Sequence, residues 1–274
     1  MRTIAVINAK GGCGKSSLAV NVAAGLGELG HPTLLIDLDP QGSASDWLGD
    51  GPGESRDLFD AFVGTRDLAE LATESRAYKV DLIPASPWLV TAERTLQVDL
   101  ALGAIRAMER LPGNWDYVIV DCPPTLGYLA SAALCGVGEA LLPTEAHGLG
   151  LTGVDAVLAE MDRVRVRLNP KLGLAGIVVS RLSRTNHARD VVASLRSTHG
   201  PVVFEATIRD SIRVPEAAVA RLPVVVNTPG APVAQDIWAV TRELIERDPN
   251  RRSAEAGPSR GWRNLVDRLV GARA

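Results

Sequence analysis

Residues 8–17 read Asn-Ala-Lys-Gly-Gly-Cys-Gly-Lys-Ser-Ser, and they follow the apolar run Ile-Ala-Val-Ile at residues 4–7. The apolar run predicts a short buried strand that ends at about Asn8. The glycines that follow allow the backbone to turn its N–H groups inward. Together with the positive end of a following helix, these N–H groups would form a cradle for an anion.

The side chains of this loop suit the phosphates of a nucleotide. Lys15 can reach the β- and γ-phosphates, the Ser16 hydroxyl can ligate Mg²⁺, and Ser17 would assist at the α-phosphate. The pattern G-x-x-x-x-G-K-[ST] fails because Ala9 stands where it needs glycine. The variant K-G-G-x-G-K-[ST] fits at every position and adds a second lysine, Lys10. The predicted nucleotide-binding residues of the loop are Lys10, Gly11, Gly12, Cys13, Gly14, Lys15, Ser16 and Ser17.

This variant resembles the deviant Walker A motif of the ParA/MinD family of P-loop ATPases, with the ParA-like subgroup favoured. In that family the first lysine, here Lys10, reaches the phosphates of the nucleotide in the partner subunit. The resemblance implies ATP and Mg²⁺ as cofactors and a homodimer in the ATP state, with Lys10 and Lys15 as catalytic residues. The residues alone also allow a single-lysine nucleotide hydrolase in which Lys10 faces solvent.

Two further apolar runs end in carboxylates, at residues 33–36 and 117–120. Alternation places Asp37 and Asp39 on the same side of the extended chain. The second run ends at Asp121, before Cys-Pro-Pro-Thr. The resemblance implies that Asp39 positions the attacking water, that Asp121 holds Mg²⁺ through water, and that Asp37 lies near the magnesium shell. The predicted metal site is therefore Ser16, Asp37 and Asp121, and the alternative is a pair of strand ends with solvated acids.

Two later segments resemble the family less closely. Residues 139–145 end in Pro-Thr-Glu, and Glu145 would contact the nucleotide or the partner subunit, or else it or Thr144 would cap a helix. Residues 207–217 resemble the family segment that lies against the adenine. Here Arg209 replaces a proline and Asp210 replaces an arginine, so both are predicted cofactor-binding residues whose contacts to the base differ from the family's.

Short apolar runs alternate with helical stretches along the 274 residues. This alternation predicts an α/β fold with a mainly parallel twisted sheet and helices on both faces, as in P-loop NTPases. The run at residues 223–226 is predicted as a strand, and residues 43–76 as a loose insertion. The predicted organisation is a P-loop ATPase domain at 1–247, a linker at 248–261 and a short basic amphipathic helix at 262–274.

Composition and charge indicate where such a protein acts. No apolar run reaches 18 residues, the chain enters a strand at once, and three cysteines lack metal spacing, so we expect a cytoplasmic protein. Residues 160–225 carry eleven Arg or Lys against six Asp or Glu. With the resemblance, this predicts non-specific DNA binding and association with the nucleoid in the ATP state. The alternative is an ordinary solvated surface. The candidate DNA contacts are Arg181, Arg184, Arg189, Arg213 and Arg221.

The resemblance implies an ATP hydrolase that positions or segregates a cargo, which could be a plasmid, a chromosome or a protein complex. Hydrolysis would be slow and stimulated by a ParB-like protein or another cargo adaptor. Three alternatives stay open at this point. They are a MinD-like ATPase that cycles on the membrane through residues 262–274, a nucleotide-gated scaffold with little turnover, and a metabolic P-loop enzyme similar to dethiobiotin synthetase. The 262–274 helix could also pack on its own domain or dock a partner.

Overall fold

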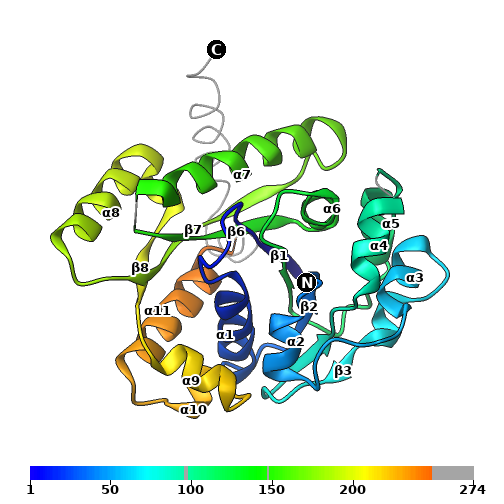
Figure 1. Cartoon of the computed structure of the whole chain (residues 1–274), viewed down its shortest axis with the longest axis horizontal. Coiled ribbons are helices and arrows are strands. Elements are labelled where there is room, and N and C mark those ends of the chain that lie inside the picture. Colours follow the sequence, from blue (N-terminus) through cyan, green and yellow to red (C-terminus); the bar gives the residue numbers. More distant parts are fainter. Residues whose placement is uncertain (96–97, 147, 249–274) are drawn as a thin grey trace, which may run out of the picture.

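The computed structural model describes residues 1–95, 98–146 and 148–248 (Figure 1). Its sheet has eight strands in the order β3-β4-β2-β5-β1-β6-β7-β8. All neighbouring strands are parallel except β3, which runs antiparallel to β4. The predicted α/β class with a mainly parallel sheet is therefore confirmed. The strands are β1 (Arg2–Val6), β2 (Thr33–Asp37), β3 (Thr73–Glu74), β4 (Val80–Ile83), β5 (Tyr117–Asp121), β6 (Glu139–Glu145), β7 (Gly173–Leu182) and β8 (Val203–Arg209).

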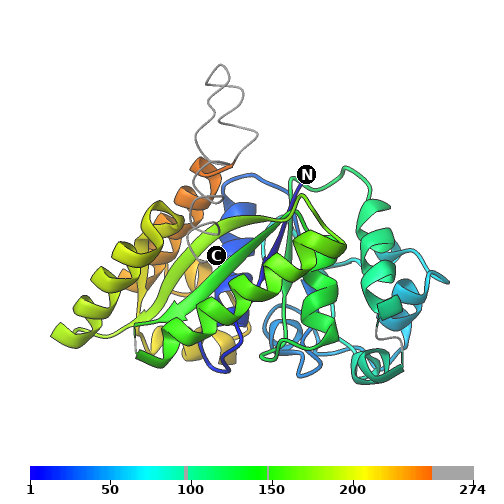
Figure 2. The ribbon, with the colours of Figure 1, turned by 90° about the horizontal axis from the view of Figure 1, so that it is seen from above.

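Successive residues of the central strand face two separate cores. Ile4 and Val6 belong to one buried cluster, while Ala5 and Ile7 belong to the other. Helices cover both faces, as predicted (Figures 1 and 2). The first core is closed by α1 (Lys15–Glu28), α2 (Ser43–Leu48), α9 (Arg213–Val219), α10 (Val224–Asn227) and α11 (Pro232–Glu246). The second is closed by α3 (Asp57–Val63), α4 (Trp88–Thr95), α5 (Val98–Glu109), α6 (Tyr128–Gly136), α7 (Gly148–Arg167) and α8 (Asn186–His199).

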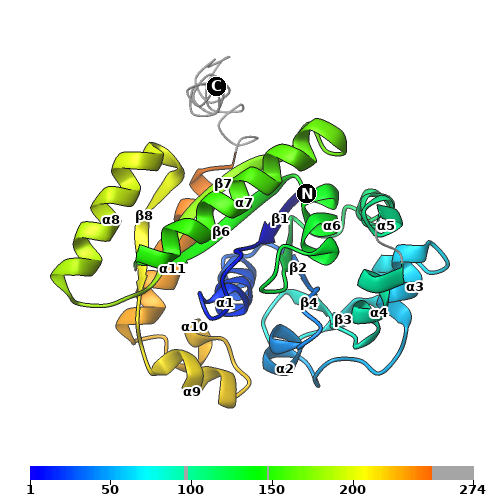
Figure 3. The same cartoon turned by 45° about the horizontal axis from the view of Figure 1, so that its top comes forward.

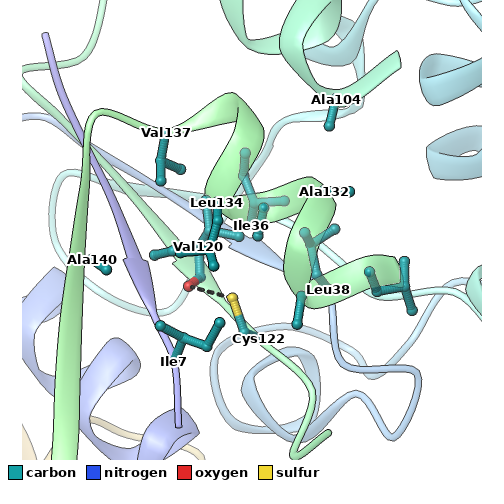
Figure 4. Close-up of a cluster of buried hydrophobic side chains, with 14 of the residues drawn as sticks. Ile7, Ile36, Leu38, Ala104, Val120, Cys122, Ala132, Leu134, Val137 and Ala140 are labelled. Carbon is teal, nitrogen blue, oxygen red and sulfur yellow. Dashed lines mark hydrogen bonds between the residues drawn. The ribbon is translucent and has the colours of Figure 1, made fainter. Parts of the chain in front are cut away.

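Figure 4 shows how the second core anchors the loop that follows β5. Cys122 is fully buried, and its thiol lies 3.8 Å from the Val120 carbonyl, in the same cluster as Ile7 and Leu38. Burial, and next the Asp121 carboxylate, raise the pKa of the Cys122 thiol well above its usual value. Cys122 is therefore an inert packing residue that fixes the chain directly after Asp121.

Two predictions about single elements were wrong. Residues 224–227 form α10 rather than a strand, because Val224 and Val225 pack into the first core instead of pairing with β8. The segment 43–76 is not loose, since it contains α2, α3, a 3₁₀ turn (Leu68–Leu71) and β3. The predicted linker after residue 248 and the predicted helix at 262–274 lie outside the described residues. In the part of the chain that is described, no helix has the length and apolarity needed to cross a membrane.

The strand order determines where a ligand can bind. The chain leaves β1 toward β2 on one side and later returns to place β6 on the other, so β1 lies at a reversal of strand order. In open parallel sheets, ligands bind outside the carboxyl ends of the strands at such a point. The loop at residues 8–14 follows β1 at this place (Figure 3).

Candidate functional site

The loop after β1 has the backbone shape that a phosphate cradle requires. Gly12 and Gly14 have φ of +76° and +87°, in the left-handed region that favours glycine. Gly14 directly precedes the first residue of α1, so the loop and the helix N-terminus share one space. Asn8 fixes the start of the loop, because its side-chain amide donates to the Pro143 carbonyl at 2.6 Å while its Oδ1 accepts the Lys10 N–H at 3.0 Å.

The two lysines of the loop point to different places. The buried Lys15 ammonium lies over the loop and donates to the Lys10 carbonyl at 3.0 Å. The Lys10 side chain is 33% exposed and its ammonium donates to the Glu145 carboxylate, at the end of β6, at 2.6 Å. Glu145, which the sequence left between several roles, is thus the partner of Lys10 within the same subunit.

Asp121 lies on the other side of the loop, opposite Asp37 in the pairing of β2 with β5. It is fully buried and neither carboxylate oxygen has a hydrogen-bond partner among the described residues. Burial, and next the Asp37 carboxylate, raise the pKa of Asp121 well above its usual value, while the Ser16 hydroxyl and the Lys15 ammonium act against this rise. A buried carboxylate of this kind is costly to ionise unless further cationic charge binds beside it.

These donors fit Mg²⁺. The described residues hold no group of three or more His, Cys, Asp or Glu side chains arranged for a metal ion. Mg²⁺ in nucleotide sites keeps several waters and takes phosphate oxygens together with one or two protein ligands. The Ser16 hydroxyl and the unpartnered Asp121 carboxylate are a donor set of that kind.

Asp37 uses its oxygens within the protein. One accepts the Ser45 hydroxyl at 2.7 Å and the Ser45 N–H at 2.8 Å, and the other accepts the Asp39 N–H at 3.1 Å. The Ser45 oxygen in turn accepts the Ala85 N–H at 2.8 Å, so Asp37 ties β2 to α2 and to the end of β4. Burial raises the pKa of Asp37 to about 6, against the lowering effect of these hydrogen bonds. The assignment of Asp37 to the magnesium shell stays a prediction.

Asp39 lies in a tight turn between β2 and α2. Its side chain accepts the Gln41 N–H at 3.0 Å and its carbonyl accepts the Gly42 N–H at 2.8 Å. These two contacts hold a nearly buried carboxylate at the same edge of the sheet as Asp121 and the phosphate loop. This arrangement is suited to orienting a water molecule near bound phosphates.

The two residues predicted at the base lie in different settings. The Arg209 guanidinium pairs with both oxygens of Asp236 on α11, at 2.5 and 2.8 Å, and that hydrogen-bonded pairing raises the pKa of Arg209. Asp210 is exposed and its carboxylate lies 3.6 Å from Nε of Arg181. Asp210 is therefore close to the phosphate loop, whereas the Arg209 side chain is held by α11.

The five arginines predicted to bind DNA do not form one group. Arg181 donates to the Gly12 carbonyl at 3.0 Å and to Glu145 at 3.0 Å, so it belongs to the phosphate loop. The others are exposed in two places, namely Arg184 and Arg189 around α8, and Arg213 and Arg221 around α9. These two helices pack on opposite faces of the sheet.

Sequence reasoning missed the bracing roles of Asn8 and Ser180. The Ser180 hydroxyl, on β7, donates to the Cys13 carbonyl at 2.7 Å. Each is a polar residue directly after an apolar run, at residues 4–7 and 174–179, and that position was a usable signal for a site at the sheet edge.

Comparison with known proteins agrees with this geometry. A family model described as an AAA domain matches residues 1–174. The chromosome partitioning protein ParA of Caulobacter vibrioides is 33% identical over 266 residues, which cover 93% of this chain and 98% of that protein. The chromosome-partitioning ATPase Soj of Thermus thermophilus is 36% identical over 251 residues, 90% of this chain and 96% of that protein.

A solved structure of a differently named protein shares the fold. The cobyrinic acid a,c-diamide synthase of Mycobacterium smegmatis, with bound ADP and magnesium, superposes with a TM-score of 0.74 at 27% identity. The match covers 94% of this chain and 97% of that one. The double-lysine loop, the parallel sheet around it and relatives matched over nearly their whole length lead to one assignment. The chain belongs to the ParA/MinD family of P-loop ATPases.

Proposed function

We propose that this protein is a ParA-like ATPase that dimerises around ATP and Mg²⁺ and uses slow hydrolysis to position or segregate a cargo. The observation that carries the proposal is the convergence of Lys10, Lys15, Asp39 and Asp121 at one edge of the sheet. The two partitioning relatives, matched over nearly their full length, support the same role. The cargo could be a plasmid, a chromosome or a protein complex.

Within one subunit, the residues have separable tasks. Lys15 and the N-terminus of α1 bind the β- and γ-phosphates. Ser16 and Asp121 would hold Mg²⁺, which would neutralise charge on the phosphate oxygens. Asp39 orients the attacking water. Catalysis at such a site consists mainly of charge stabilisation and placement of the nucleophile.

The second subunit would be engaged by Lys10. Its side chain is one-third exposed at the rim of the loop, where it can exchange Glu145 for the phosphates of the partner's nucleotide. The neighbouring loop surface is open, because a Cβ added to Gly12 would meet nothing within 4 Å. The open surface at Gly12 and the partly exposed Lys10 would allow the phosphate loop of a second subunit to approach closely.

DNA would be bound by the exposed arginines through phosphate contacts. Arg184 and Arg189 are the best placed, because Arg213 already pairs with Glu216 at 2.8 Å. In this proposal the ATP dimer binds nucleoid DNA in the cytoplasm. It is released when a ParB-like or cargo-adaptor protein stimulates hydrolysis. Membrane contact through residues 262–274 is the alternative platform.

Binding to non-specific duplex DNA tests the proposal. The Asp39→Ala protein, which should hold ATP unhydrolysed, is titrated onto labelled DNA with ATP or ADP at two salt concentrations and followed by fluorescence anisotropy. We expect binding only with ATP, and an affinity that falls as salt rises because phosphate contacts release counterions. Replacing Arg184 and Arg189 together by alanine should weaken binding, whereas Arg163→Ala on α7, paired with Glu160, serves as the matched control. Equal binding with ADP, or none with ATP, would contradict the nucleoid-bound state.

A further inference from the structure

Arg181, near the end of β7, contacts the phosphate loop. Its Nη1 donates both to the Gly12 carbonyl and to the Glu145 carboxylate at 3.0 Å, and its Nε lies 3.6 Å from Asp210. Its backbone has a φ of +51°, a conformation that is uncommon for a residue with a side chain. Its neighbour Ser180 binds the next loop carbonyl, that of Cys13, at 2.7 Å. Two consecutive residues near the end of β7 therefore donate hydrogen bonds to two consecutive carbonyls of the loop.

The direction of a bound nucleotide follows from the strand order. Asp39 follows β2 and Asp121 ends β5, on one side of β1, and with Ser16 they mark the magnesium and γ-phosphate end of the proposed site. A nucleotide is elongated, so its base must extend from the loop to the other side of β1. That side is formed by the carboxyl ends of β6, β7 and β8, where Glu145, Arg181 and Asp210 lie.

We propose that Arg181 contacts the base of the bound nucleotide by stacking its guanidinium plane on the face of the ring. This inference rests on ATP binding at the phosphate loop, as proposed above, and adds a residue to that site. Glu145 and Asp210 hold the guanidinium from two sides, while 55% of the side chain remains exposed and available to a ligand. Arginine suits this role because its planar cation stacks on aromatic rings, including nucleobases.

As a base-contacting residue, Arg181 would affect the binding of nucleotides and not of DNA. A residue that contacts the base affects ADP and ATP alike, since both carry the same base. It has little effect on an inorganic polyphosphate, which fills only the cradle. A cation that acted through charge alone would weaken all three ligands together.

Calorimetric titration of the full-length Arg181→Met protein with ADP, ATP and tripolyphosphate tests this. We expect the affinities for ADP and ATP to fall about tenfold, the scale of one stacked charged contact, and that for tripolyphosphate to change by less than about twofold. Arg181→Lys keeps the charge without the plane and should stay well below the wild type for ADP. Arg163→Met, on α7 and paired with Glu160 away from the loop, is the matched control and should bind like the wild type.

Three results would overturn the stacking role. They are an unchanged affinity for ADP in Arg181→Met, an equal loss for tripolyphosphate, and full recovery of ADP binding in Arg181→Lys. A thermal melt of each variant without nucleotide confirms that it is folded. A wild-type protein that binds neither ADP nor ATP would instead refute the phosphate-loop assignment, so failure of the proposed function is seen separately.

Discussion

At the scale of single residues, Asp121 is a buried carboxylate whose ionised form a bound cation would stabilise. Its carboxylate is carried into the interior by β5, and neither oxygen makes a hydrogen bond of normal geometry among the described residues, although the Ser16 hydroxyl and the Lys15 ammonium are near enough to favour its charged form. An ionised carboxylate in such surroundings destabilises the protein without ligand, and a bound cation removes that penalty. The same side chain therefore lowers stability in the empty site and stabilises the loaded one.

Asp121→Asn should separate these two effects. Replacing the buried carboxyl group, whose charged form burial disfavours, by an amide is expected to raise the thermal midpoint of the nucleotide-free protein by about 2 °C or more at pH 7. It should also abolish the extra stabilisation that Mg²⁺ adds in the presence of ADP, measured by scanning fluorimetry with and without the metal. Asp116→Asn is the control, because Asp116 is a surface carboxylate beside His31. Persistence of the full Mg²⁺ effect in Asp121→Asn would refute its role at the metal.

Single residues were predictable where a motif fixes them. Lys10 and Lys15 lie in one short glycine-rich motif and Asp121 ends an apolar run, so local sequence patterns predicted that all three would lie where a strand ends. The hydrogen bond from Arg181 to the loop was not predictable from the sequence. It joins two residues 169 positions apart, and it forms only because the fold places the end of β7 beside the loop. The pairing of Asp37 with Ser45 was missed for a related reason, since it needs the turn between β2 and α2.

At the scale of elements, α3 and α5 approach unusually closely on the face away from α1. A Cβ added to Gly103 in α5 would lie 2.0 Å from the Phe62 carbonyl of α3, where no side-chain atom fits. Both helices close the second core with large side chains such as Phe59, Phe62 and Met108. Their contact thus depends on the absence of a side chain at one position.

Gly103→Ala should therefore lower the free energy of unfolding by about 1–3 kcal/mol, as overpacking of a core does. Gly113→Ala is the control, since a Cβ there would meet nothing within 4 Å and its φ is not in the left-handed region. Urea unfolding measures both variants, and ADP affinity of the folded protein should be unchanged in each. A Gly103→Ala protein as stable as the wild type would show that the two helices are not in this contact.

Elements were predictable where apolar runs were flanked by turn residues, as at β1, β2 and β5. The error at α10 has a physical cause, because a short buried apolar run has no period long enough to separate strand from helix. The segment 43–76 was read as loose because of its glycines. Several of these stand between α2 and α3, or at the end of α3, where Gly64 has a φ of +85°.

At the scale of the whole molecule, one edge of the sheet carries the entire candidate site. The magnesium end lies over β2 and β5, the phosphate cradle over β1, and the predicted base end over β7 and β8. Among the described residues of the site, Lys10 points away from the loop, because its ammonium binds the Glu145 carboxylate of its own subunit. In the dimer proposed above, Lys10 would leave Glu145 and contact the nucleotide of the second subunit.

The mass of the Asp39→Ala protein in solution, measured by light scattering with Mg²⁺ and either ATP or ADP, tests this claim most directly. We predict a mass near 29.0 kDa with ADP and twice that value with ATP. Adding Lys10→Ala should return the ATP sample to the monomer mass while ADP binding is retained, and adding Lys171→Ala, a lysine distant from the loop, should not. A dimer that forms equally without Lys10, or a monomer with ATP and intact Lys10, would contradict the account.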